Sequence, residues 1–325
     1  MRYDRDSFLS GVAVGRNMKS WPKMDGTLQD SFMFVIDTEL GGSTEYDFWL
    51  KKDNSNYPYI IIDWGDGTES LANDGANTHQ YQEHGKYVVS VHGYIHSVKF
   101  GLSQTYYSES SALSLLAILT PIRVSPNIYS NTIALTSLCS GCRNLSHVPG
   151  GLFKYYYQNG YYIGLQYAFT NCKALKKVSE SLFDGYLIQD SIYRIDLPQM
   201  FNGSGLEEIP ANLFSSVDFS KVQWMEMMFA GTNITTIPSG LFDHLVNCRG
   251  FNSVFQNCQN LRSVPSDLFS EIVDIGSCRF TFYNCSSIVS SVPNLWDDFP
   301  DADHVYCYRG CTGALNYDAI PAGWK

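Results

Sequence analysis

The sequence predicts a mixed fold: a short N-terminal helix, a small all-β sandwich and a long α/β solenoid built from repeats. Three observations predict this fold. An apolar stretch with capping residues opens the chain, and short strand-like runs that alternate with turn residues fill positions 30–93. A motif with the skeleton F-x-x-C-x-x-L-x-x-[IV]-P-x-x-L-F, best seen at 255–269, then recurs every 26 to 32 residues.

The N-terminal helix is expected over residues 6–20, because polar capping residues precede it and Trp21-Pro22 ends it. A helix this short is marginal alone. It either packs on its own chain or docks on another subunit, and residues 1–26 are interpreted as a docking helix with its linker. The candidate docking residues are Phe8, Leu9, Gly11, Val12, Gly15 and Met18.

The next domain is expected over residues 27–96 as a small β-sandwich. Its strands are predicted where runs rich in β-branched and aromatic residues lie between turn residues, at 32–36, 46–50, 57–64 and 86–92. The glycines at 65, 67 and 85 mark the turns between them. Several short strands over so few residues are typical of an Ig-like sandwich.

Two motifs in this domain carry a family resemblance. Trp64-Gly-Asp-Gly67 is a W-G-D-G turn, and His79 to Tyr87 reads H-x-Y-x-x-x-G-x-Y. The domain therefore resembles the PKD (polycystic kidney disease-type) family, which implies an Ig-like β-sandwich. Asp63 and Asp66 offer carboxylates for either Ca²⁺ or turn capping. Two carboxylates fall short of the six to eight oxygen ligands of Ca²⁺, so turn capping is favoured.

The repeats are expected to fill residues 97–325, with a degenerate first coil and seven recognisable repeats from about 133. The L-x-x-[IV]-P step predicts a short strand, since proline cannot donate to a ladder. The L-F step predicts a short helical turn that packs back on the strand. Such units bury their apolar faces only by stacking, and Trp324 is expected to close the last one.

One repeat position is occupied by a small, weakly polar residue in every repeat. The column reads Cys142, Cys172, Ser204, Thr232, Cys258, Cys285 and Cys311. A position that accepts Cys, Ser or Thr does not require a disulfide bond, so the cysteines are interpreted as buried, reduced thiols. A zinc site that joins Cys139 and Cys142 to Cys307 and Cys311 is not expected, because six repeats separate the pairs.

The repeated motif resembles the BspA-like (Treponema-type) leucine-rich repeats of bacterial surface proteins, over roughly residues 133–325. The resemblance implies an α/β leucine-rich-repeat solenoid. Proteins of this kind also combine such repeats with a PKD-like domain.

Charge and composition narrow the function classes. A net charge of −10 argues against binding to nucleic acid or to an anionic membrane surface, and no apolar run approaches the length of a membrane span. No signal peptide is visible, so we expect export, if any, by another route. No catalytic constellation, cofactor motif or metal-ligand set is found. The chain is therefore interpreted as non-enzymatic.

Aromatic residues make up 14% of the chain, with 22 tyrosines. The excess serves either an exposed recognition surface or the filling of a thin core. A candidate ligand-binding surface, or alternatively an aromatic pack between coils, is formed by Tyr155, Tyr156, Tyr157, Tyr161 and Tyr162. The acidic loop 297–303 is interpreted as a solvated face, with a cation site as the alternative.

The leading hypothesis is a phage virion protein, a fibre or decoration adhesin that is assembled in the host cytoplasm. Its N-terminus would attach to other virion subunits in multiple copies or as a homo-oligomer, and its repeats would bind a host surface protein or glycan. A bacterial BspA-like surface adhesin is the first alternative. A carbohydrate-active enzyme with an unrecognised site is the second.

Overall fold

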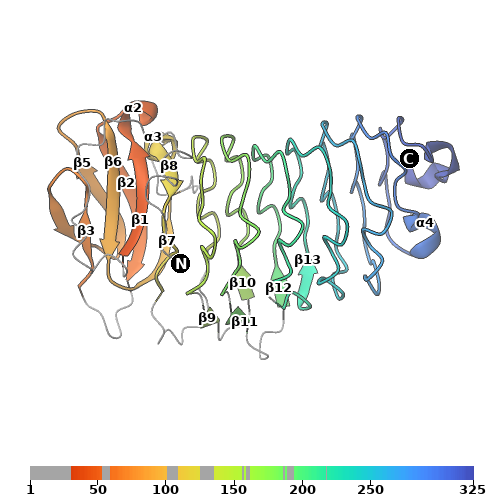
Figure 1. Cartoon of the computed structure of the whole chain (residues 1–325), viewed down its shortest axis with the longest axis horizontal. Helices are drawn as coiled ribbons and strands as arrows, with labels where there is room; N and C mark the ends of the chain where they lie inside the picture. Colours follow the sequence, from red (N-terminus) through yellow and green to blue (C-terminus); the bar gives the residue numbers. More distant parts are fainter. Residues whose placement is uncertain are drawn as a thin grey trace.

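A computed structural model of the chain describes residues 31–52, 59–100, 109–124, 135–155, 157–158, 162–185, 187–188, 194–216 and 218–325. The expected docking helix at 6–20 lies outside the described residues. Figure 1 shows an elongated molecule, with antiparallel sheets at one end and a row of turn-rich repeats that runs to the C-terminus at the other.

The N-terminal part contains two antiparallel sheets. The five-stranded sheet has the order β4-β3-β6-β1-β8, with bounds Glu69–Leu71, Ile61–Asp63, Lys86–His92, Ser31–Asp37 and Leu115–Ile118. The three-stranded sheet has the order β5-β2-β7, with bounds Gly75–Gln80, Glu45–Lys52 and Ile95–Lys99. Two short helices, α2 (Thr38–Gly41) and α3 (Glu109–Ser114), pack against each other beside the sheets.

The period-2 pattern of β1 explains how the five-stranded sheet is buried. Phe32, Phe34 and Ile36 point to one face and join the main hydrophobic core. Val35, between them, joins a second small cluster with Val88 of β6. Both faces of the central strands are therefore buried, which is why β1 reads as a nearly continuous apolar run.

Strand β8 joins the sheets to the repeats. It pairs antiparallel with β1 on one side, and on the other Ala117 makes a parallel bridge to His147 of the first repeat. The N–H of Ile118 donates to the His147 carbonyl at 3.0 Å, and the N–H of Phe100 donates to the Leu138 carbonyl at 2.7 Å. The sheets and the repeats consequently share one continuous core.

The predicted fold class is wrong in its α/β leucine-rich-repeat solenoid. In the described residues from 135 to 325, the only α-helix is α4 (Leu295–Asp298), with two single-turn 3₁₀ helices, Tyr317–Ala319 and Ala322–Trp324. The Leu-Phe steps that were expected to be helical are hydrogen-bonded turns, except at α4. The described chain is built mainly of strands and turns.

Backbone hydrogen bonding explains why the repeats are not helical. The N–H of Phe255 donates to the Thr281 carbonyl of the next repeat at 2.9 Å, whereas the N–H of Cys258 donates to Phe255 within its own repeat at 3.1 Å. Along this segment, some backbone N–H groups thus donate to the next repeat and others donate within their own repeat. A helix would direct every N–H to its own fourth preceding residue.

A residue with a left-handed backbone recurs in every repeat, two positions after the first residue of the F-x-x-C motif. It is Gly or Asn in each case, with φ between 59° and 89°: Gly141, Asn171, Gly203, Gly231, Asn257, Asn284 and Gly310. Gly and Asn adopt this conformation more readily than other residues. This position therefore ends any helical propagation in every repeat.

The repeats stack their aromatic rings in a continuous column. Successive centroids are 5.5 to 5.8 Å apart and the ring planes differ by 6° to 14° along Phe169, Phe201, Phe229, Phe255, Phe282 and Tyr308. The last ring packs on Trp324 at 6.3 Å, and the N–H of Tyr308 donates to the Trp324 carbonyl. The prediction that Trp324 closes the last repeat is confirmed.

The nine cysteines are buried and form no disulfide. In the Cys/Ser/Thr column, the thiols donate to a carbonyl of the preceding repeat: Cys258 to Phe229 at 3.1 Å, and Cys285 to Phe255 at 3.0 Å. Burial raises the pKa of Cys258 to about 11. These thiols are structural donors in a dry core, which confirms their interpretation as buried thiols.

Short parallel strands accompany the turns on another side of the row. β10 (Tyr162–Gly164), β12 (Arg194–Asp196) and β13 (Val222–Trp224) form one sheet, and β9 (Tyr157–Gln158) pairs with β11 (Leu187–Ile188). The L-x-x-[IV]-P steps, expected to be strands, contribute only isolated bridges such as Thr236 to Ser263. None of the helices in the described residues is long and apolar enough to cross a membrane.

The hydrogen bonds of the buried thiols predict opposite changes in the free energy of unfolding for two substitutions in the Cys/Ser/Thr column. Ser204 is buried in the same column, and its hydroxyl has no hydrogen-bond partner among the described residues. Ser204→Cys should stabilise the fold by about 1 kcal/mol, because the longer thiol reaches the preceding carbonyl. Cys258→Ser should destabilise it by about 1–3 kcal/mol. Urea unfolding of both variants checks this, and shifts of the same sign would contradict it.

Candidate binding surface

The structure describes only part of the predicted tyrosine surface. The side chain of Tyr155 is described, and Tyr157 and Tyr162 are placed by their backbones in β9 and β10. Tyr156 and Tyr161 lie outside the described residues. So do all six candidate docking residues, Phe8, Leu9, Gly11, Val12, Gly15 and Met18.

Tyr155 belongs to a cluster at the junction of the sheets and the first repeat. The Arg123 guanidinium lies 4.9 Å from the centre of the Tyr155 ring and 5.5 Å from that of Tyr94. The Lys154 ammonium lies 5.0 Å from the Tyr155 ring. We call Tyr94, Arg123, Lys154 and Tyr155 the junction patch. Its members come from segments before β7, after β8 and after the first Leu-Phe step.

The junction patch is electropositive. Burial would raise the pKa of Tyr155, but the hydrogen bond from Arg123 and the charge of Lys154 lower it below its usual value. Tyr155 is partly exposed and Lys154 is exposed. An aromatic ring beside two cations can stack on a flat ligand face and attract an anionic group.

Sequence reasoning identified Tyr155 but missed Arg123 and Tyr94. Both lie in segments outside the tyrosine-rich stretch, and the fold brings them to it. The N–H of Ile95 donates to the Arg123 carbonyl at 2.9 Å, which holds the two segments together. Lys154 could have been found, because it directly precedes Tyr155.

A second aromatic cluster, which the sequence did not indicate, lies on the last repeats. The Phe280 ring contacts Tyr283 at 5.6 Å and Tyr306 at 5.8 Å. Arg279 and Arg309 flank these rings. Arg279 also pairs with Asp303 at 3.3 Å, so one carboxylate of the acidic loop 297–303 is engaged in an ion pair.

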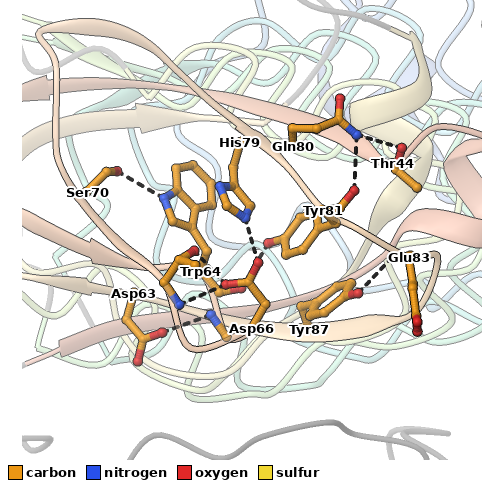
Figure 2. Close-up of polar contacts among 12 residues, drawn as sticks. Thr44, Asp63, Trp64, Asp66, Ser70, His79, Gln80, Tyr81, Glu83 and Tyr87 are labelled. Atoms are coloured by element: carbon orange, nitrogen blue, oxygen red, sulfur yellow. Dashed lines mark hydrogen bonds and ion pairs between the residues drawn. The ribbon is translucent and has the colours of Figure 1, made fainter.

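The W-G-D-G and H-x-Y motifs meet in one cluster within the sandwich (Figure 2). The His79 ring stacks on Trp64 at 4.8 Å, and Tyr81 stacks on Tyr87 at 3.9 Å. The Tyr81 hydroxyl donates to the Trp64 carbonyl at 2.9 Å. These contacts are intramolecular and largely buried, so the cluster holds the turn in place and is not an open binding site.

Asp63 and Asp66 cap the turn between β3 and β4. Asp63 accepts a hydrogen bond from the N–H of Gly65 at 2.8 Å, and Asp66 accepts one from the N–H of Thr68 at 3.0 Å. Asp66 also contacts His79 Nε2 at 2.8 Å. The turn-capping interpretation is confirmed. Among the described residues, no group of three His, Cys, Asp or Glu side chains is placed to hold a metal ion.

The hydrogen bonds of Asp66 predict that Asp66→Asn lowers the free energy of unfolding by an amount that depends on pH. Burial raises the pKa of Asp66, but hydrogen bonds from Thr68 and His79 lower it overall. A lowered pKa stabilises the fold above the unfolded-state value of about 4, and this is lost as pH falls through the folded-state pKa. Asp66→Asn should cost about 1–2 kcal/mol at pH 7 and much less at pH 3.

Urea unfolding at the two pH values measures the difference, with the exposed Glu271→Gln as the matched control. Equal destabilisation by Asp66→Asn at both pH values would contradict the assignment.

The junction patch predicts that Arg123→Gln raises the pKa of Tyr155, because the substitution removes a hydrogen bond to the hydroxyl and a nearby charge. Titration followed by carbon NMR of a chain labelled at the tyrosine Cζ measures it, with Tyr155→Phe to assign the signal. Arg143→Gln removes an exposed cation of the same repeat and should leave the titration unchanged. An unchanged Tyr155 titration in Arg123→Gln would refute the contact.

Comparison with known proteins does not place the chain in a family. Neither a scan against protein-family models nor a search of curated proteins finds a match to it. A functional proposal therefore has to start from the residues and contacts of the chain itself.

Proposed function

We propose that this chain is a non-enzymatic structural protein of a phage particle, a fibre or decoration protein that displays a binding surface. The observation that carries the proposal is the continuous core, which runs from Phe32 in β1 to Trp324 at the end of the repeats. A body with one uninterrupted core acts as a rigid spacer, and its elongated shape is seen in Figure 1.

The assignment of the two parts follows from their contacts. We infer that the N-terminal sandwich is of the PKD type, which is supported by the contacts of Trp64, His79, Tyr81 and Tyr87 in Figure 2. The repeats present the junction patch, with exposed or partly exposed aromatic and cationic groups, to a host surface protein or glycan. The motif resemblance to BspA-like sequences favours the same role.

Attachment to the particle is assigned to residues 1–26, on the apolar spacing of Phe8, Leu9 and Val12 in the sequence. A bacterial surface adhesin is the alternative, but no specific contact favours it.

The proposal predicts that the full chain sediments with particles and that a variant with Phe8→Asp and Leu9→Asp does not. Charges at these apolar positions would oppose burial of the segment against a partner subunit. Density-gradient sedimentation of lysates from cells that make the chain measures the bound fraction. Tyr155→Ser is the matched control, because it alters the display surface and should stay on the particle. Full retention of the charged variant would refute attachment through this segment.

A further inference from the structure

A pocket lies between the first two repeats, at a position to which no role has been given so far. It has a volume of about 350 Å³ and is lined by residues 147–150 of one repeat and 177–179 of the next. This size falls at the lower end of the roughly 300–1,000 Å³ that small-molecule sites occupy. It is large enough for a small ligand and too small for a peptide segment.

The pocket lies in a part of the chain with an unusual charge. Residues 110–179 contain six Lys or Arg and no Asp or Glu, although the whole chain carries a net charge of −10. The basic residues are Arg123, Arg143, Lys154, Lys173, Lys176 and Lys177. A local positive field within an acidic protein attracts anions to this region.

Lys177 is the cation of the pocket. It occupies the same motif position as His147 in the preceding repeat and Glu208 in the following one. The neighbouring Lys176 forms an ion pair with Glu207 at 2.9 Å, and its charge is therefore shared. No carboxylate within ion-pair distance of Lys177 is found among the described residues. Basic groups thus line this position only in the first two repeats.

The remaining lining combines apolar and hydroxyl groups. Val148, Pro149 and Val178 supply an apolar surface, and Ser179 contributes a hydroxyl, which lies 2.7 Å from the hydroxyl of Ser181. A Cβ atom at Gly150 would lie 2.2 Å from Ser181 Oγ and 3.3 Å from Ser179 Oγ. A side chain at this position would therefore displace the Ser181 hydroxyl and press against that of Ser179.

His147 adds a polar ring to the wall. Burial and the nearby charge of Lys177 lower its pKa, so the ring is neutral at pH 7. The pocket then presents one full positive charge, a neutral imidazole, a hydroxyl and an apolar floor. This set suits a ligand with a single carboxylate, hydroxyl groups and an apolar ring face.

We propose that this pocket binds a uronic-acid unit of an acidic polysaccharide, with Lys177 on the carboxylate and the Val148–Pro149 surface under the sugar ring. The proposal rests on the display function proposed above. It names the class of glycan that the displayed repeats would bind. A single Lys without an Arg fork offers one point charge, which matches one carboxylate, and the net charge of −10 disfavours nucleic acid as the ligand.

Titration calorimetry of the purified full chain tests the proposal with a galacturonic-acid tetramer as the probe. The methyl-esterified tetramer, which has the same size and hydroxyls but no charge, and inorganic sulfate are the two comparison ligands. Binding of the acidic tetramer at least tenfold tighter than either comparison ligand is expected. Equal binding of the ester would refute the role of the carboxylate, and equal binding of sulfate would refute the saccharide.

Two variants locate the site. Lys177→Gln should weaken binding of the acidic tetramer about tenfold or more, since a charge-assisted hydrogen bond is lost. Lys176→Gln removes the same charge one residue away, outside the pocket lining, and should leave binding unchanged. Equal losses in both variants would mean general electrostatic attraction and would overturn the assignment.

The test is independent of particle attachment, because it uses the purified chain in solution. Failure of the tetramer to bind would refute the ligand and leave the display function standing. Loss of sedimentation with particles would affect the display function alone.

Discussion

Each repeat directs alternate backbone N–H groups away from itself, and these groups need the carbonyls of the next repeat. The N–H groups of Ser253, Phe255 and Asn257 all donate to the following repeat at 2.8–2.9 Å. A buried N–H without an acceptor costs as much as a lost hydrogen bond, so no repeat is complete without its neighbour. The position of every other group in the row depends on this register.

The side chains follow from the same register. Hydrogen-bonded neighbours bring equivalent residues into contact, so the rings of Phe229 and Phe255 lie 5.8 Å apart and nearly parallel. A thiol at the column of Cys258 reaches the carbonyl of the preceding repeat, and Thr232 meets the same need by bonding to Phe229 in its own repeat. One backbone rule thereby explains why the ring, the small polar residue and the Gly or Asn recur together.

The register also creates the binding surface. Because β8 pairs with β1 and bridges to His147, the first repeat is held against the edge of the five-stranded sheet. Arg123 follows β8 directly and therefore meets Tyr155 of the first repeat. The pocket at Lys177 lies between the first two repeats, which this register places side by side.

Much of this arrangement could be predicted from the sequence, and the failures have physical causes. Runs of β-branched and aromatic residues identified the long strands β1, β2 and β6, whereas β4 is exposed and β5 has a polar sequence, so neither shows a clear apolar pattern. The repeat period and the columns of buried residues could be predicted because the same apolar positions recur in each repeat of the sequence. The Leu-Phe steps fold into isolated turns, such as the one in which the N–H of Ser270 donates to the Asp267 carbonyl, and their apolar residues do not distinguish such a turn from a short helix.

The junction patch could not be predicted for a different reason. Tyr94, Arg123 and Tyr155 belong to three segments, and only the pairing of β7 and β8 with their partners brings them together. Tyr155 was found because tyrosines cluster around it in the chain. A contact between distant segments leaves no such local pattern.

The C-terminal closure has a consequence for how separate molecules behave toward one another. A stack of repeats that ended on Tyr308 would present a flat ring and open N–H groups, a template on which another chain could add itself and grow into a fibre. Trp324 covers that ring, its carbonyl accepts the Tyr308 N–H, and its own ring stacks on His304 at 4.1 Å. Among the described residues, Trp324 covers one end of the row of repeats and the sheets cover the other.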